Sequence, residues 1–274
     1  MNKVIVVLCD ALRDDVAAQA MGYLEHLVED KRASRYTVIA GLPTLSRPLY
    51  ETIHTGVSVS EHGITSNNTV RRSSTPNIFQ LATAAGRTTA AAAYCWYSEL
   101  YVRAPYDRVA DREVDDAQQW IQHGRFYSED DYPDIELFAA GGMLVQRFLP
   151  DYVLMHAMGL DTVGHEYGGD SAQYRNQAIL QDQILAHLIP LCVQAGYMIL
   201  VTGDHGMSSD KNHNGTLPDV RHVPLYVVAP PDAPPDRRLG YSGQQVSQLR
   251  IAPTVLRLLD VPQPATMKQP PLLS

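Results

Sequence analysis

The chain has 274 residues, of which 45% are hydrophobic and 19% are charged, a composition typical of a folded globular protein. Its formal net charge of −8 and its isoelectric point near 5.6 argue against a nucleic-acid polymer or an anionic membrane as the main partner, because both bind basic surfaces. An anionic substrate would therefore need local positive charge, such as that of bound metal ions.

The cysteines predict a reducing compartment. Cys9, Cys95 and Cys192 lie in apolar stretches without Cys-x-x-Cys spacing, which favours buried thiols over disulfides. The first expected strand begins directly after Met1-Asn-Lys and leaves no room for a signal peptide. No apolar run approaches the ~20 residues that span a bilayer. We therefore expect a cytoplasmic protein without a membrane partner.

In chain order, apolar strand-like runs alternate with helix-like segments, the pattern of a mostly parallel sheet with helices on both faces. The expected strands are Val4–Leu8, Thr88–Tyr94, Tyr152–Ala157, Met198–Thr202 and Val223–Val228. The expected helices are Thr75–Gly86, with Thr75 as its N-cap, Asp134–Phe148 and Ser171–Ala195. The sequence thus predicts a doubly wound α/β fold in a single domain, residues 1–274.

Residues 98–132 interrupt this alternation. They are rich in Tyr, Asp and Arg and lack a clear periodicity, so we expect a small lid or an insertion that faces the substrate. The acidic stretch Ser128–Asp131 within it is expected to be solvated lid surface.

Carboxylate and imidazole side chains follow three of the expected strands. Asp10 ends the first strand, Asp161 and His165 follow the third, and Asp204 and His205 follow the fourth. Because α/β folds keep their active sites at the carboxyl ends of the strands, we expect these side chains to meet at one edge of the sheet. Their oxygen and nitrogen donors suit zinc, with manganese or iron as competitors, and a two-metal hydrolytic site needs two such groups of ligands.

A further motif begins at Thr44-Leu-Ser46-Arg-Pro48 and continues with Thr55-Gly56 and His62-Gly-Ile64. With these spacings the sequence resembles the alkaline phosphatase superfamily, and within it the type I phosphodiesterase/nucleotide pyrophosphatase family and the phosphonoacetate hydrolases. Those proteins place a nucleophilic Thr two residues before a Pro and ten residues before the Gly of a Thr-Gly pair. The resemblance covers about residues 1–68 and 150–262 and implies an alkaline phosphatase-like fold.

The resemblance assigns roles to the residues of this motif. Ser46 takes the place of the nucleophile, with Ser in place of the usual Thr, and Thr44 stays open as an alternative. Asn67 matches an Asn that donates to a phosphoryl oxygen of the substrate, although the adjacent Asn68 stays open too. Sulfatases share the spacing but carry an Arg two residues after the Pro, where this chain has Tyr50, so sulfatase activity is disfavoured.

The resemblance also implies two metal sites. One would be held by Asp161, His165 and His213, and the other by Asp10, Asp204, His205 and the Ser46 oxygen. His213 fits the family's last ligand because a connector and the strand that starts at Val223-Pro-Leu follow it. His222, beside that strand, stays open as an alternative.

Together these residues imply a two-metal hydrolase that cleaves phosphodiester or pyrophosphate bonds of a small anionic phosphorylated substrate through a covalent phosphoseryl intermediate. Phosphonoacetate-type C–P hydrolysis and phosphomonoester hydrolysis rank lower. A phosphotransferase or mutase of the same superfamily also stays open. So does a catalytically silent protein that binds metal or a phosphorylated metabolite.

Overall fold

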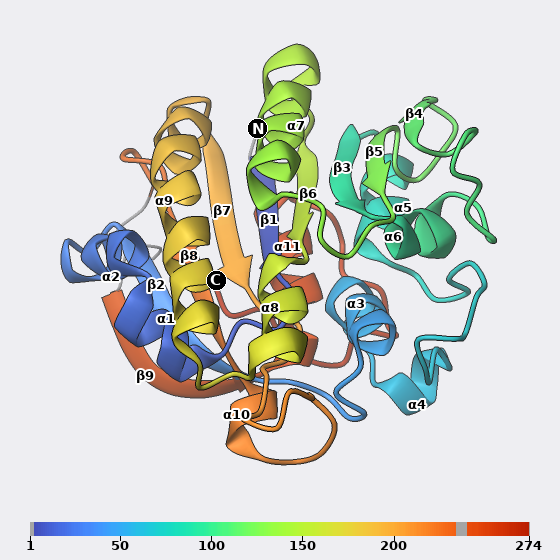
Figure 1. Ribbon diagram of the computed structural model, residues 1–274. Helices are drawn as coiled ribbons and strands as arrows, with labels where there is room; N and C mark the ends of the chain where they lie inside the picture. Colours follow the sequence, from blue (N-terminus) through green and yellow to red (C-terminus); the bar gives the residue numbers. More distant parts are fainter. Residues whose placement is uncertain (1–2, 234–239, 274) are drawn as a thin grey trace.

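The computed structural model describes residues 3–233 and 240–273, and in this part of the chain nine strands form one sheet in the order β4-β5-β3-β6-β1-β7-β8-β2-β9 (Figure 1). The strands are β1 (Lys3–Cys9), β2 (Ala33–Ile39), β3 (Thr89–Tyr94), β4 (Glu113–Asp115), β5 (His123–Tyr127), β6 (Tyr152–Ala157), β7 (Tyr197–Thr202), β8 (His222–Val228) and β9 (Gly240–Ser247). Only β4 and β8 run antiparallel to their neighbours in the described residues. The sheet is therefore mostly parallel.

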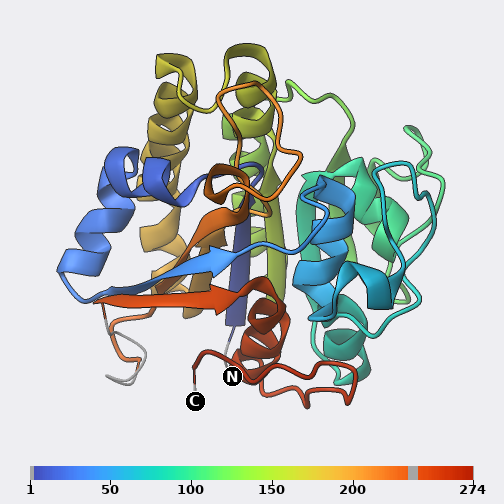
Figure 2. The same ribbon diagram turned by 90° about the horizontal axis from the view of Figure 1, so that it is seen from below.

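Helices cover both faces of this sheet. They are α1 (Asp14–Ala20), α2 (Gly22–Glu29), α3 (Ser46–Thr55), α4 (Val59–His62), α5 (Ile78–Ala84), α6 (Cys95–Tyr101), α7 (Asp134–Phe148), α8 (Gly159–Tyr167), α9 (Ala172–Gln194), α10 (Pro218–Arg221) and α11 (Ile251–Leu258). A short 3-10 helix, η2 (Gln248–Arg250), precedes α11. Figure 2 shows α7 and α9 on one side of the sheet and α11 on the opposite side. Within the described ranges, no helix combines the length and the apolar character that crossing a membrane requires.

The alternation of side chains along β1 produces two hydrophobic cores. Val4 and Val6 pack in a core with α3, α5, α6 and α11, whereas Ile5 and Val7 pack in a second core with α1, α2, α7, α8 and α9. Every residue of β3, β6 and β7 is buried, as expected of parallel strands with both faces covered. The prediction of a doubly wound α/β fold is confirmed.

The predicted elements agree with the structure more closely in type than in their ends. The five predicted strands correspond to β1, β3, β6, β7 and β8, and the helices predicted at 134–148 and 171–195 correspond to α7 and α9. The prediction of Thr75 as an N-cap is wrong. The side chain of Asn77 accepts the capping bond from the Gln80 N–H at 3.0 Å, so α5 begins at Ile78.

Parts of the segment 98–132 belong to regular structure, and a role for it as a lid stays a prediction. Its first residues complete α6, and β4 and β5 extend the sheet at its edge, where β5 pairs parallel to β3. The sequence missed these strands because they are short and polar, like many edge strands. The division of the chain into a single domain stays a prediction.

Candidate functional site

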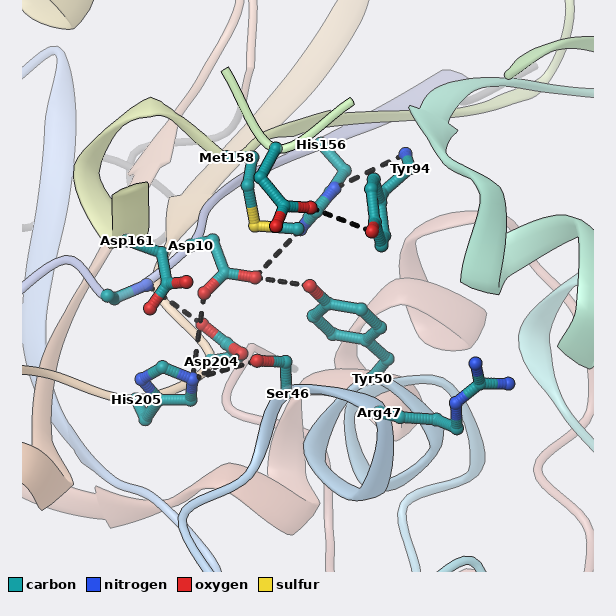
Figure 3. Close-up of polar contacts among 12 residues, drawn as sticks. Asp10, Ser46, Arg47, Tyr50, Tyr94, His156, Met158, Asp161, Asp204 and His205 are labelled. Atoms are coloured by element: carbon teal, nitrogen blue, oxygen red, sulfur yellow. Dashed lines mark hydrogen bonds and ion pairs between the residues drawn. The ribbon is translucent and has the colours of Figure 1, made fainter. Parts of the chain in front are cut away.

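The carboxyl ends of β1, β6 and β7 lie side by side because β1 pairs with both of the other strands. Asp10 directly follows β1, Asp204 and His205 follow β7, and Asp161 stands on α8, which begins just after β6. The His205 Nε2 atom lies 3.6 Å from Asp10 Oδ1 and 3.2 Å from Asp204 Oδ2. Figure 3 shows these side chains pointing toward one another, with Ser46 beside them.

Three carboxylates at this place each keep one buried oxygen without a hydrogen-bond donor among the described residues. These atoms are Asp10 Oδ1, Asp161 Oδ1 and Asp204 Oδ2. A buried polar atom without a partner is costly, and a buried unpaired charge is costlier still. Cations between the carboxylates would supply the missing partners, so the donor set fits divalent metal ions.

The three nearby histidines share one tautomer, which leaves Nε2 able to accept a bond. Each donates its Nδ1–H to a backbone carbonyl: His165 to Lys211 at 2.9 Å, His205 to Gly206 at 2.9 Å and His213 to Thr44 at 2.6 Å. Because a carbonyl oxygen can only accept, the proton is on Nδ1 and the Nε2 lone pair is free. The Nε2 atoms of His165 and His213 lie 3.5 and 3.8 Å from Asp161 Oδ1.

Burial shifts the ionisation of the site strongly. It raises the pKa of Asp10 and Asp161 well above the usual range, and the next largest cause is the charge of a neighbouring carboxylate. Burial also lowers the pKa of His205 to about 3 and, together with the charge of His205, that of His213 to about 3. Both imidazoles are therefore neutral near pH 7, which is the form that binds metal.

The ligand atoms form two groups, each with its atoms within 4.8 Å of one another. One group consists of Asp10, Asp204 and His205, and the other of Asp161, His205 and His213. His205 is shared, whereas His165 stands at the margin with a side chain that is 46% exposed. The structure thus brings all the predicted metal-ligating side chains to one place, but groups His205 with both sets. His222 begins β8 and belongs to neither group.

Ser46 lies against these groups as the first residue of α3. Its Oγ is buried and 3.1 Å from His205 Nε2. The hydroxyl of Thr44, by contrast, donates to the His213 carbonyl oxygen at 2.5 Å. The Ser46 hydroxyl therefore faces the ligand groups, and the Thr44 hydroxyl supports the backbone that carries His213.

Asn67 is held next to the same helix end. Its Oδ1 accepts the Arg47 N–H at 3.1 Å, which leaves its Nδ2 as a donor for another group. Asn68 is exposed on the surface. Of the two asparagines, Asn67 is the one fixed beside Ser46.

Sequence reasoning missed two residues that contact Asp10. The hydroxyl of Tyr50 donates to Asp10 Oδ2, and His156 Nε2 lies 3.1 Å from the same oxygen (Figure 3). His156 is part of an apolar strand and Tyr50 is part of an amphipathic helix, so neither stands out from the sequence as a partner of Asp10. The parallel register, which places His156 opposite Leu8, is the signal that could have found it.

Comparison with known proteins identifies a matching family and related folds. A family model described as type I phosphodiesterase/nucleotide pyrophosphatase matches residues 4–220. GPI ethanolamine phosphate transferase 2 of Candida albicans is 22% identical over 305 residues, which cover 96% of this chain but 30% of the relative. The chain therefore spans less than a third of the length of this curated relative.

Two solved structures share the fold over nearly the whole chain. Murine ectonucleotide pyrophosphatase/phosphodiesterase 5, as an inactive variant in complex with AMP, has a TM-score of 0.74 at 14% identity, with coverage of 100% of this chain and 98% of that one. A phosphonate monoester hydrolase from Silicibacter pomeroyi has a TM-score of 0.70 at 15% identity, with coverage of 99% and 76%.

The prediction of a cytoplasmic location is contradicted by the curated relatives. These relatives are named GPI ethanolamine phosphate transferases, and the buried free cysteines, on which the prediction relied, do not outweigh that finding. The exclusion of a nucleic-acid polymer and of a membrane partner stays a prediction, since it depends on net charge.

Proposed function

This chain belongs to the type I phosphodiesterase/nucleotide pyrophosphatase family, in the alkaline phosphatase superfamily, and from that premise we propose that it is a two-metal hydrolase of phosphodiester or pyrophosphate bonds. The observation that carries the proposal is the position of Ser46: its Oγ lies 3.1 Å from His205 Nε2, next to carboxylate oxygens that have no donor among the described residues. A hydroxyl in this position would become a nucleophile when a cation binds beside it.

The residues that would hold the cations are those of the two ligand groups, with His165 and the Ser46 oxygen completing them. Zinc suits these donors best, and manganese or iron are the competitors. When bound, two divalent cations lower the pKa of the serine hydroxyl and neutralise charge that develops on the phosphoryl group.

The chain's own residues then account for a two-step reaction. Ser46 Oγ loses its proton to solvent and bonds to phosphorus, while the bond from phosphorus to the leaving oxygen breaks and that oxygen takes up a proton. Water then attacks the phosphorus, the bond from phosphorus to Ser46 Oγ breaks, Oγ takes up a proton, and the phosphorylated product leaves. The free Nδ2 of Asn67 and the N-terminus of α3 stabilise the negative charge on the phosphoryl oxygens.

The test compares substrates on protein loaded with Zn²⁺ or Mn²⁺. Bis-p-nitrophenyl phosphate and the p-nitrophenyl ester of thymidine monophosphate should turn over faster than p-nitrophenyl phosphate, phosphonoacetate and p-nitrophenyl sulfate. Acid quenching during turnover should leave a phosphoryl adduct on Ser46, detected by mass spectrometry. Preference for phosphonoacetate or the monoester would replace the proposed bond type, and a metal-loaded protein inert toward all five would favour a silent binder.

A second candidate is transfer of ethanolamine phosphate to an alcohol, and the names of the curated relatives favour it. The carboxylate of Asp130 accepts the Tyr94 hydroxyl at 2.8 Å, and the Asp130 backbone oxygen accepts the hydroxyl of Thr162, the neighbour of Asp161. An exposed carboxylate so close to the ligand groups suits the ammonium of an aminoethyl ester.

The aminoethyl and hydroxyethyl esters of p-nitrophenyl phosphate distinguish the transferase from the hydrolase. A transferase should prefer the aminoethyl ester and pass the phosphoryl group to added glycerol more often than to water. Asp130→Asn should reduce the preference about tenfold, the effect of ~1.4 kcal/mol, without slowing the hydroxyethyl ester. Equal rates on both esters, with water as the only acceptor, would count against the transferase.

A further inference from the structure

Tyr50 occupies the position at which a sulfatase would carry an arginine. Its hydroxyl contacts Asp10, a residue of one of the two ligand groups. Tyr50 lies one helical turn after Ser46 on α3 and is fully buried. Its hydroxyl donates to Asp10 Oδ2, which is also 3.1 Å from His156 Nε2 (Figure 3). Asp10 Oδ1 has no donor in the described part of the chain. The two oxygens of the Asp10 carboxylate therefore differ, because Oδ2 has two neighbouring donors and Oδ1 has none among the described residues.

We propose that Tyr50 and His156 are a pair of positioning residues that hold Asp10 by Oδ2, so that Oδ1 alone is presented to a cation. This inference rests on the proposed function. Two donors on one oxygen stop the carboxylate from rotating into a bidentate or bridging arrangement, and residues of this kind are known to orient metal ligands in other proteins.

The contacts of His156 fix which of its nitrogens donates. The Tyr94 backbone N–H donates to His156 Nδ1 at 3.4 Å, so this nitrogen is an acceptor. The Tyr127 hydroxyl donates to the His156 carbonyl oxygen at 2.9 Å. The proton is therefore on Nε2, which donates to Asp10. The parallel pairing of β6 with β1 keeps the imidazole beside the end of β1.

The ring of Tyr50 is held as firmly as its hydroxyl. It stacks on Tyr97 at 4.6 Å between ring centroids and meets the His156 ring edge-on at 4.8 Å. Because Ser46 and Tyr50 share one rigid helix, the bond to Asp10 also fixes the distance between the nucleophile and the cation bound there. Loss of the hydroxyl should therefore affect both metal affinity and turnover.

The experiment measures Zn²⁺ affinity by competition with a chelating dye, independently of turnover. Tyr50→Phe removes the hydroxyl and keeps the packing, and His156→Leu removes the other donor. Each should weaken one of two bound Zn²⁺ ions by about 10-fold or more and leave the other unchanged. With saturating Zn²⁺, kcat of Tyr50→Phe on the preferred diester should stay below that of the wild type.

Two variants act as matched controls. Tyr152→Phe removes another buried hydroxyl of the same core, one that meets His54 Nε2 at 3.1 Å, away from the ligand groups. His156→Gln keeps a donor near the position of Nε2. Both should bind two Zn²⁺ ions with nearly wild-type affinity.

Unchanged affinity for both ions in Tyr50→Phe would overturn the inference while leaving the proposed function intact. A wild-type protein that binds no Zn²⁺ or Mn²⁺ would instead overturn the proposed function. If His156→Leu does not fold, Tyr50→Phe and its control still decide the question.

Discussion

At the scale of single residues, two hydroxyls only two positions apart have different partners. Ser46 Oγ faces His205 Nε2, whereas the Thr44 hydroxyl donates to the His213 carbonyl oxygen. Ser46→Ala should therefore lower kcat by about 10³-fold or more with nearly unchanged metal content, because only the attacking atom is lost. Activity on the preferred diester and metal analysis on the same sample would measure both.

Thr44→Val is the matched comparison. It should keep kcat within about tenfold of the wild type and lose stability by about 1–3 kcal/mol, since the His213 carbonyl loses a buried donor. Full activity in Ser46→Ala together with an inactive Thr44→Val would move the nucleophile to Thr44.

Glu51 is a second residue with a measurable signature. Glu51 belongs to α3, and its buried carboxylate accepts the hydroxyls of Ser73 and Tyr101 at 2.5 and 2.8 Å. Burial raises the pKa of Glu51 from 4.5 to about 7, although these bonds lower it in part. Between these two values the folded protein holds a proton that the unfolded chain has lost. The free energy of unfolding therefore falls as pH rises from about 4.5 to 7.

Glu51→Gln, which imitates the protonated carboxyl, should remove this dependence. Relative to the wild type, the variant should gain on the order of 3 kcal/mol between pH 4.5 and pH 8. Urea unfolding of both proteins at the two pH values measures the change, and contributions from other groups cancel in the comparison. A constant difference between the proteins would show that the folded state does not raise the pKa of Glu51.

The sequence pointed to the side chains that the structure brings together at the sheet edge, but not to Tyr50 and His156, which contact Asp10. Asp10 and Asp204 each follow a strand that the apolar pattern reveals, so their meeting at one edge of the sheet could be expected. The role of His156 depends on which strands are neighbours and in what register, and a single sequence does not contain that information.

At the scale of elements, one buried carboxylate ties three helices together. Asp134, the first residue of α7, accepts the Gly159 N–H at the start of α8 at 3.2 Å. It also accepts the amides of Gln177 and Gln181 on α9 at 2.8 and 2.7 Å. Because α8 carries Asp161 and His165, Asp134 helps to position two of the proposed metal ligands without contacting them.

Asp134→Ala should lower the free energy of unfolding by about 2–3 kcal/mol and weaken metal binding. Asp182→Ala is its control, since Asp182 accepts the Tyr23 and Leu24 N–H groups at the start of α2, away from the site. It should cost similar stability and leave metal affinity unchanged. Equal affinities in the two variants would contradict the role given to Asp134.

Two strands, β2 and β9, could not be predicted from the sequence, and the reason is the same for both. β2, with the sequence ASRYTVI, buries Ser34, Arg35 and Thr37, and Arg35 pairs with Asp14 at 2.8 Å. A buried strand with so many polar residues does not stand out by hydrophobicity. β9, with the sequence GYSGQQVS, is still more polar and lies at the sheet edge. Tertiary pairing outweighs local pattern in both strands.

At the scale of the whole molecule, two hydrophobic cores hold a cluster of buried carboxylates at the edge of the sheet. Without cations these groups repel one another and lack partners, so the site lowers the stability of the fold. With cations bound to the folded state alone, mass action adds about 2.7 kcal/mol when the free metal is at 100 times its Kd. Chelation should therefore lower the melting temperature by about 5–10 °C.

The order of the melting temperatures of Asp204→Asn and the wild type should differ between chelator and Zn²⁺. This comparison tests the role of Asp204 more sharply than chelation of the wild type alone. The amide keeps an oxygen for the Ala11 N–H, which Asp204 Oδ1 now accepts at 3.1 Å, but removes one buried charge. In chelator the variant should melt above the wild type, because the repulsion among the carboxylates is smaller. In saturating Zn²⁺ it should melt below the wild type, because one ligand is lost. Parallel melting curves with the same order in both conditions would mean that Asp204 does not bind the metal.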